Sequence, residues 1–284
     1  MDNRKKRGMN IHARRAIAHV VLILITFLCL FWFYVLLINA TRTNSQISSG
    51  FSPLPGKNLI ENWKNLIGGT LPVVRSMINS VIVSTCSAVL CVYFSTMTAY
   101  ALHVYEFRMK KFMYTFILAV MMIPTQVTAL GFVRLMNSMN LTDTFVPLIV
   151  PAIAAPVTFF YMKQYMDSAL PLALVEASRI DGAGEFRTFN TIVLPLMKPA
   201  IAVQAIFTFV SSWNNYFTPA LILHKDKVKT LPIVIAQLRS ADFLKFDMGQ
   251  VYVMIAFSIF PVIVVYLLLS KYIVGGVAVG SVKG

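Results

Sequence analysis

The sequence predicts an all-α membrane protein with six transmembrane helices, and its composition and apolar segments support this fold class. Of its 284 residues, 57% are hydrophobic and only 13% are charged, whereas soluble domains carry about 25% charged residues. Six apolar segments reach the roughly 20 residues that a helix needs to cross a bilayer. Cys29, Cys86 and Cys91 lie inside apolar segments without a metal-binding spacing, so neither a disulfide nor a metal site is expected.

The predicted spans follow one another with polar segments between them. The first follows a basic segment, as in a signal peptide, but its apolar core is too long and no A-x-A site follows it, so we expect a retained anchor. The predicted spans are 16–39, 79–102, 112–133, 145–165, 200–221 and 251–273. The predicted organisation is a basic N-terminus at 1–15, a first helix with an outer loop at 16–74, a transmembrane domain at 75–273 and a Gly-rich tail at 274–284.

Charge asymmetry predicts the orientation. Residues 1–15 hold six Lys or Arg and one acid, and 103–111 adds three basic residues. Such excesses are typical of the cytoplasmic side. With six crossings, both termini and the segment 166–199 are predicted to be cytoplasmic. The net charge of +14 is then attributed to topology and anionic lipid rather than to nucleic acid. The segment 222–250 is an exception, because it is basic but predicted to lie outside.

The predicted spans lack the groups that other membrane functions need. No carboxylate falls within them, and His19 is interpreted as a structural side chain near a helix end. Motifs of zinc proteases, serine hydrolases and P-loop ATPases are absent from the sequence. A self-sufficient secondary carrier and a membrane-embedded enzyme are the alternatives from other classes. Prolines in or at the ends of spans predict bent helices, and these are Pro124, Pro147, Pro151, Pro156 and Pro261.

The cytoplasmic segment 166–199 is predicted to form an elbow of two short helices. Ser168 can cap the first helix, and Pro171 is tolerated in its first turn. Gly182 ends this helix and permits a sharp turn. A second short helix then continues to Pro195, after which the chain enters the membrane again.

Side-chain spacing predicts how the first helix of the elbow is used. Glu176 and Arg179 are predicted to form an i,i+3 ion pair. The opposite face is small and mainly apolar, and it is formed by Leu170, Leu174, Ala177 and Ser178. We expect this surface to bind another protein.

The same segment resembles a known family. It matches E-A-A-x3-G-x9-I-x-L-P, the EAA signature of the membrane subunits of bacterial ABC importers, with Ser178 in place of the second alanine. The matching residues are Glu176, Ala177, Gly182, Ile192, Leu194 and Pro195. The sequences at 180–183 and 194–199 resemble those of carbohydrate importers of the oligosaccharide class, similar to the second permease of the maltose system. Further ordered matches extend the resemblance over about 75–284, at 79–80, 99–102, 213–214 and 276–284.

The resemblance implies both a function and a set of partners. The chain would be a permease subunit in a bacterial inner membrane, with a homologous second permease, an extracellular solute-binding protein and surrounding lipid. A cytoplasmic ABC ATPase dimer would bind the elbow and hold ATP and Mg, so this chain would bind no cofactor and would not be an enzyme. The implied coupling residues are Glu176, Ala177, Ser178, Gly182, Ile192, Leu194 and Pro195.

A polar and aromatic set late in the fifth span suggests a cargo path. Its amides can hydrogen-bond to hydroxyls and its rings can stack on a sugar, although such residues are also typical of anchors at the membrane surface. The set is Trp213, Asn214, Asn215 and Tyr216. The predicted cargo is a di- or oligosaccharide moved by alternating access.

Two further segments have open interpretations. The basic outer residues resemble a contact surface for the binding protein, but they also suit an anionic sugar or phosphorylated polyol, or acidic lipid. They are His224, Lys225, Lys227 and Lys229. In the tail, Gly276, Gly280 and Gly284 are spaced for helix packing or for a flexible contact with the ATPase.

Overall fold

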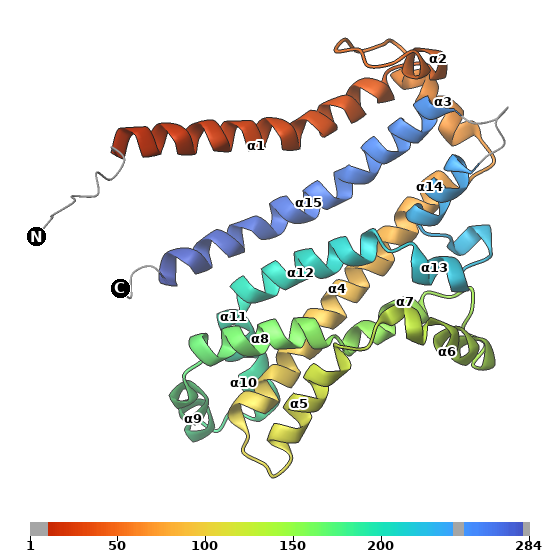
Figure 1. Ribbon diagram of the computed structural model, residues 1–284. Coiled ribbons are helices and arrows are strands. Elements are labelled where there is room, and N and C mark those ends of the chain that lie inside the picture. The colour runs from red at the N-terminus through yellow and green to blue at the C-terminus, as the bar shows by residue number, and fades with distance from the viewer. Residues whose placement is uncertain (1–10, 241–246, 281–284) are drawn as a thin grey trace, which may run out of the picture. The chain divides into compact units, whose positions relative to one another are not determined.

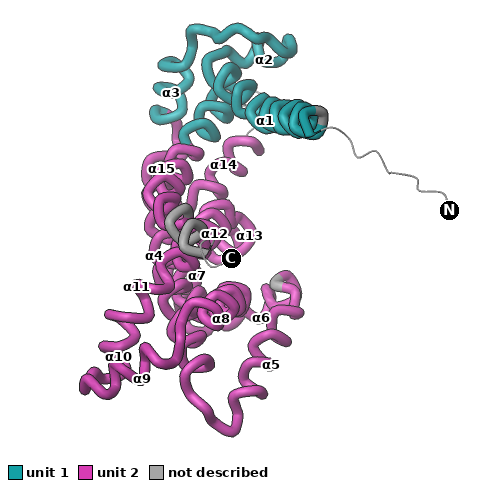
Figure 2. Tube along the Cα trace, turned by 90° about the vertical axis from the view of Figure 1, so that its left-hand side faces the viewer, with its two compact units in different colours: residues 1–68, 242–257 teal, residues 69–241, 258–284 magenta. Residues whose placement is uncertain are grey.

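The computed structural model describes residues 11–240 and 247–280, and the regular secondary structure in these ranges is helical (Figure 1). The chain divides into two compact units (Figure 2). The first comprises residues 1–68 and 242–257, and the second comprises residues 69–241 and 258–284. The predicted organisation assigned 242–257 to the transmembrane domain, whereas the structure groups this segment with the N-terminal one.

The first unit is held together by buried polar contacts between its helices. The Arg42 guanidinium is buried and donates to Asn39 Oδ1 (3.2 Å) and to the Gly50 carbonyl (3.0 Å). The Asn62 amide donates to the carbonyls of Ala40 (3.1 Å) and Arg42 (2.9 Å). These bonds satisfy carbonyls at the end of the first helix. The helices of the unit are α1 (Ile11–Ala40), α2 (Asn44–Ser48), α3 (Leu59–Gly68) and the beginning of α15 (Met248–Gly280).

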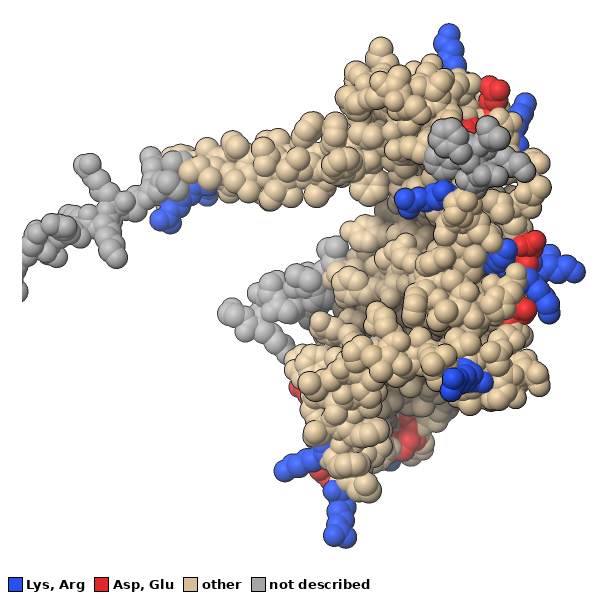
Figure 3. All heavy atoms as spheres, turned by 45° about the vertical axis from the view of Figure 1, so that its right-hand side comes forward, with Lys and Arg blue, Asp and Glu red and all other residues tan. Residues whose placement is uncertain are grey.

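Most of the α1 surface is apolar and not covered by the described protein. In its most apolar stretch only 6% of the residues are buried. Figure 3 shows basic side chains near its N-terminal end and an uncharged surface along the rest. A helix that is hydrophobic on all sides needs lipid or another protein around it.

The second unit is built around α4 (Val73–Val104). Both α8 (Pro156–Ala169) and α12 (Lys198–Trp213) pack against α4. Cys91 Sγ donates to Thr158 Oγ1 (3.3 Å) and accepts from Thr208 Oγ1 (3.5 Å), which links the three helices. Small polar side chains allow helix backbones to approach closely. The buried ones on α4 include Ser76, Ser80, Ser84, Ser87, Cys91 and Ser95.

Four of the five prolines lie at the starts of helical elements rather than inside bent helices, whereas Pro261 lies within α15. The span predicted at 112–133 is two helices, α5 (Lys110–Val120) and α6 (Thr125–Ser138), and the chain changes direction between them (Figure 1). Pro124 precedes α6 and cannot donate the N–H that a continuous helix would require.

The fourth and fifth predicted spans are also divided. The fourth consists of α7 (Val146–Ile149), the 3₁₀ turn η1 (Val150–Ile153) and α8, with a proline at the start of each. The fifth ends at Trp213, and α13 (Phe217–Ile222) follows.

The structure gives four or five candidate spans where six were predicted. Four helical stretches in the described residues are long and apolar enough, namely Arg14–Ala40, Val73–Val104, Val146–Ala169 and Met248–Ile273. The pair Glu185–Leu196 and Lys198–Trp213, which is bent by 81°, can form a fifth. The halves of the predicted third span, α5 and α6, are 11 and 14 residues long, and these lengths correspond to about 16 and 21 Å.

The last helix is longer than predicted. α15 continues through Pro261 and past Ile273, so residues 274–280 of the predicted Gly-rich tail extend the helix. Gly276 and Gly280 lie within it. Gly284 and the basic residues at 4–7 lie outside the described residues.

Candidate functional site

The elbow (residues 171–196) connects α8 to α12 through four short elements. Its first helix begins after Pro171, but Ser168 does not cap it, because α8 continues to Ala169 and the Ser168 hydroxyl donates to the Tyr165 carbonyl (2.8 Å). The turn predicted at Gly182 is present, with φ at 79°, a left-handed conformation that favours glycine. The elements are α9 (Leu172–Ile180), α10 (Glu185–Thr188), the π-helical turn η2 (Phe189–Val193) and α11 (Leu194–Leu196).

Three residues of the EAA signature lie on the surface of the elbow. Glu176, Ala177 and Gly182 are all exposed. The ion pair predicted between Glu176 and Arg179 is wrong, because Arg179 Nε donates instead to Glu185 Oε1 (2.7 Å) across the turn. The Glu176 carboxylate makes no hydrogen bond or ion pair within the part of the chain that the structure describes.

The face predicted to bind another protein is only partly accessible. Leu174 and Ala177 are exposed as expected, whereas Leu170 and Ser178, predicted on the same face, are buried, as is Val175. The Ser178 hydroxyl bonds to Thr188 Oγ1 (2.7 Å) and so joins the two arms of the elbow. Ser178 therefore holds the elbow together rather than contributing to its exposed surface. The face is displaced because Val175 packs into the core of the second unit.

The remaining signature residues follow the turn η2. Ile192 and Leu194 are partly buried, and Pro195 is exposed near the start of α11. Pro195 has no N–H for the bond to residue 191 that an α-helix would make, which is consistent with a wider π turn before it. The chain then bends by 81° into α12.

Polar contacts attach the elbow to the C-terminal end of α4. The Tyr100 hydroxyl donates to Glu185 Oε2 (2.9 Å). The Arg179 guanidinium lies 5.6 Å from the centroid of the Tyr105 ring, within the range of a cation–π contact. Burial, followed by hydrogen bonding to Glu185, raises the pKa of Tyr105. These contacts join the elbow to α4 and to the residue that follows it.

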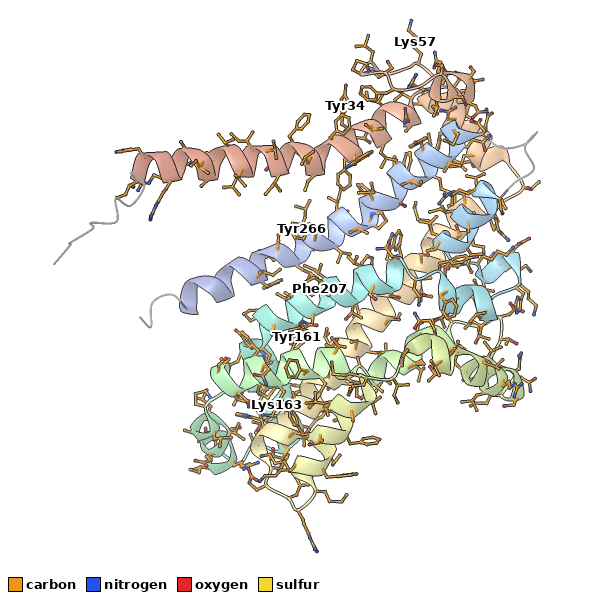
Figure 4. The ribbon with its side chains drawn as sticks, viewed as in Figure 1. Tyr34, Lys57, Tyr161, Lys163, Phe207 and Tyr266 are labelled. Carbon is orange, nitrogen blue, oxygen red and sulfur yellow. The ribbon has the colours of Figure 1, made fainter. Side chains whose placement is uncertain are left out.

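A second attachment lies at the entrance of the elbow. The His103 ring contacts Asp167 Oδ1 through Nδ1 (2.8 Å) and the Leu170 carbonyl through Nε2 (3.0 Å). Lys163 Nζ, labelled in Figure 4, lies 2.5 Å from the same Asp167 oxygen. We call His103, Lys163, Asp167 and Leu170 the His103 junction.

The structure brings three of the four predicted path residues together. Trp213, Asn214 and Tyr216 line a cavity of about 400 Å³ with α14 (Leu231–Arg239), and Arg239 is part of its wall. Asn215 does not line this cavity and instead lines a separate one. The path residues are divided because α12 ends at this point and the chain turns at residues 214–216.

A further cavity was not anticipated from the sequence. It has a volume of about 450 Å³ and lies between α8 and α12, where Tyr161, Gln164, Tyr165 and Gln204 contribute to its wall. Figure 4 shows Tyr161 on α8. These residues are spread over two helices, so no local sequence motif indicates them.

The outer loop (residues 222–230) begins with the last residue of α13 and contains the 3₁₀ turn η3 (Asp226–Val228). His224, Lys225 and Lys227 are exposed, whereas the Lys229 side chain is 12% exposed and lies 2.6 Å from Asp226. Figure 3 shows basic side chains gathered with a few acidic ones on this face. Three of the four predicted contact residues are therefore accessible.

Asp143 fixes one side of the outer loop. Its Oδ1 accepts the backbone N–H groups of His224 (2.6 Å) and Lys225 (3.0 Å), and its own N–H donates to the Ile222 carbonyl (2.9 Å). These bonds, first that from Lys225, lower the pKa of Asp143. Asp143 has φ at 58°, a conformation that Asp and Asn tolerate better than other non-glycine residues.

The N-terminal part of α4 fixes the other side of the outer loop. Arg75 Nε donates to the Lys227 carbonyl (2.9 Å), and Asn79 donates to the carbonyls of Lys227 (3.1 Å) and Lys229 (2.9 Å). Ser80 Oγ accepts the N–H of Leu231 (2.8 Å). One helix thus bonds to the outer loop near its beginning and to the elbow near its end.

Residues 92–279 match the family described as the binding-protein-dependent transport system inner membrane component. The chain belongs to this family. The permease is 32% identical over 267 residues to the arabinooligosaccharides transport system permease protein AraQ of Bacillus subtilis (strain 168), covering 92% of this chain and 93% of the relative. It is also 32% identical over 269 residues to the sn-glycerol-3-phosphate transport system permease protein UgpE of Brucella abortus (strain 2308), with coverages of 92% and 94%.

The fold of the permease occurs in a solved transporter. A chain of a bacterial ABC transporter involved in the import of the acidic polysaccharide alginate superposes with a TM-score of 0.78 at 20% identity, covering 93% of the permease and 99% of that chain. The permease is thus an inner-membrane component of an ABC importer, and it works within a complex.

Proposed function

We propose that the permease forms one half of a carbohydrate pathway in a bacterial inner membrane and imports a di- or oligosaccharide. Both termini lie in the cytoplasm. A homologous second permease completes the pathway, and an extracellular solute-binding protein delivers the cargo. ATP and Mg are bound and used by a separate ABC ATPase dimer, which binds the elbow.

The observation that carries this proposal is the exposed part of the EAA signature on an internally bonded elbow. Glu176, Ala177 and Gly182 face outward, while Ser178, Arg179 and their partners fix the backbone beneath them. Small side chains permit close approach, and an exposed carboxylate offers a charge to a basic partner. Because the elbow is bonded to α4, movement of the bound ATPase is passed to the helices of the pathway.

The cavity lined by Trp213, Asn214 and Tyr216 favours a sugar as cargo. Trp213 and Tyr216 supply aromatic rings and Asn214 supplies an amide, in a space of about 400 Å³. Sugar hydroxyls need hydrogen-bond partners when they leave water, and their apolar faces pack on aromatic rings. The relative AraQ is named for arabinooligosaccharide transport, which favours the same cargo class.

A second candidate cargo is an anionic sugar or a phosphorylated polyol. Arg239 lines the same cavity and offers a fixed positive charge. The relative UgpE is named for sn-glycerol-3-phosphate transport. Replacement of Arg239 by Gln would distinguish the two cargoes, because it is expected to reduce uptake of an anionic cargo and to leave uptake of a neutral sugar unchanged.

The proposed function is tested by purifying the permease with its associated proteins and reconstituting the complex in liposomes. We expect an ATPase to copurify and labelled oligosaccharides to enter only when ATP and the binding protein are supplied. Uptake at the same rate without ATP would contradict the proposal. Uptake by the permease alone, driven by a proton or sodium gradient, would indicate a secondary carrier.

A further inference from the structure

His103 lies between two hydrogen-bond acceptors. Its Nδ1 is 2.8 Å from the Asp167 carboxylate, and its Nε2 is 3.0 Å from the Leu170 carbonyl. A neutral imidazole carries one N–H and one bare nitrogen, so it can donate to only one of them. Both contacts are satisfied only when the ring is an imidazolium with two N–H groups.

The Leu170 carbonyl is an important partner because of its place in the chain. Leu170 ends α8 and is 2% exposed, and Pro171 begins the elbow. A buried carbonyl without a donor is costly. The His103 ring supplies that donor from α4, one turn beyond Tyr100, which bonds to Glu185 at the far side of the elbow.

The charged groups around the ring have defined positions. From α8, Asp167 accepts both from His103 and from Lys163, whose Nζ lies 2.5 Å from the same oxygen. Leu170, which directly precedes the elbow, contributes an uncharged carbonyl, while Arg179 and Glu185 of the elbow pair with each other. After α4, Glu106 pairs with Lys110 at 2.6 Å. Asp167 favours the protonated ring, and Lys163 opposes it.

From this geometry we infer that His103, as an imidazolium, is a positioning residue that attaches the entrance of the elbow to α4 and so couples ATPase movement to the pathway. This inference rests on the proposed function. Loss of the second ring proton leaves a ring nitrogen whose lone pair faces the Leu170 carbonyl or the Asp167 carboxylate. Two acceptors then face each other, and the attachment of His103 to the entrance of the elbow opens. The number of cargo molecules imported per ATP therefore falls as the cytoplasmic pH rises.

The direct test is ¹⁵N nuclear magnetic resonance of histidine-labelled permease in its complex, with the His103 signals assigned by their loss in His103→Gln. At pH about 6 we expect both ring nitrogens to carry hydrogen-bonded protons. A bare ring nitrogen at that pH would overturn the inference. This measurement needs neither cargo nor ATP, so it gives an answer even if the proposed function fails.

The functional test is the ratio of imported cargo to ATP hydrolysed in liposomes. We expect His103→Gln to lower this ratio about fivefold, since a hydrogen bond to a charged group is lost. We also expect the wild-type ratio to fall toward the variant's as the pH is raised and the His103 ring loses its second proton. His19→Gln is the matched control, because that ring bonds to Arg15 within its own helix.

The outcomes distinguish a failure of the inference about His103 from a failure of the proposed function. Equal ratios and equal pH profiles for wild type and His103→Gln would overturn the inference while leaving the proposed function intact. Absence of ATP-dependent uptake by the wild-type complex would contradict the proposed function instead. Should His103→Gln fail to assemble, the pH profile of the import-to-ATP ratio of the wild-type protein decides the question.

Discussion

The elbow and the outer loop are both irregular segments of the second unit that are attached to α4, but the attachments differ in kind. The elbow is held by side chains that bond to one another, such as Tyr100 with Glu185 and Ser178 with Thr188. The outer loop is held by side chains such as Asn79, which bond to its backbone. The sequence of the outer loop is therefore free to change while its shape is kept, whereas the elbow depends on particular residues.

The largest effect is expected at Gly182, which has a left-handed backbone. Replacement of Gly182 by Val forces a β-branched residue into that conformation and should lower ATP-coupled uptake about tenfold. Gly184 is the matched control, because a Cβ at either glycine would meet open space but Gly184 does not have a positive φ. Gly184→Val should transport nearly as well as wild type. Equal effects of the two substitutions, at equal membrane levels, would contradict the role given to the turn.

Substitutions of the two glutamates of the elbow, Glu176 and Glu185, should have smaller effects that differ in kind. Glu185→Ala removes bonds to Tyr100 and Arg179 and is expected to destabilise the permease by about 1 kcal/mol, a modest value because the site is partly exposed. Glu176→Ala should leave thermal stability unchanged and weaken ATPase binding. Thermal unfolding in detergent and copurification of the ATPase measure the two effects. A loss of stability in Glu176→Ala would show that its carboxylate is structural.

The outer loop should be loosened by Asp143→Ala. This substitution removes the acceptor for two backbone N–H groups, so hydrogen exchange at His224 and Lys225 should accelerate about tenfold. Asp226→Ala is the control in the same loop, because its carboxylate bonds to the Lys229 side chain rather than to the backbone. Unchanged exchange in Asp143→Ala would refute the attachment.

Charge reversal at the exposed Lys225 and Lys227 tests the charge of the outer surface, and at Lys225 it also removes the pair with Asp143 (3.7 Å). We expect the double substitution to Glu to slow association with the binding protein about threefold at low salt, and less at high salt, because exposed charges are screened. Kinetic binding measurements at two salt concentrations provide the check. A salt-independent effect would indicate a change of shape instead.

The smallest response is expected from the outer loop on acidification. The pKa of Asp143 is lowered in the folded protein, so the stabilisation by its carboxylate is complete above the ordinary value of about 3.9 and is lost as pH falls through the lower folded value. Exchange at His224, corrected for the intrinsic rate, should therefore not change between pH about 5 and 8. The elbow should respond in the opposite direction, through His103 at alkaline pH.

Much of the elbow could be predicted because its signals are local. The Gly182 turn and the helices around it follow from residues that are close in sequence. The exposed face of α9 was predicted only in part: Leu174 and Ala177 are exposed, but Ser178 is buried, because tertiary packing of Val175 decides which side of the helix faces the core. Likewise, the pair of Arg179 with Glu185 spans the turn and could not be found from helical spacing alone.

The outer loop and the His103 junction could not be predicted from local signals. Their bonds join residues far apart in the chain, such as Asn79 to Lys227 and His103 to Leu170. The divided spans were missed for another reason. Pro124 was expected to bend a helix, but α6 begins directly after it. Apolar composition indicates which segments suit the membrane interior, but it does not indicate where the backbone breaks.

The π turn at 189–193 has a consequence for how the molecule can be altered. A π turn contains one residue more than an α turn, and each residue of an α-helix rotates the following face by about 100°. Removal of one residue from this turn would therefore convert it to regular helix and rotate α11 relative to α9, and because the chain bends by 81° after α11, this rotation would change the direction of α12. The width of this single turn thus helps to set the direction in which α12 leaves the elbow.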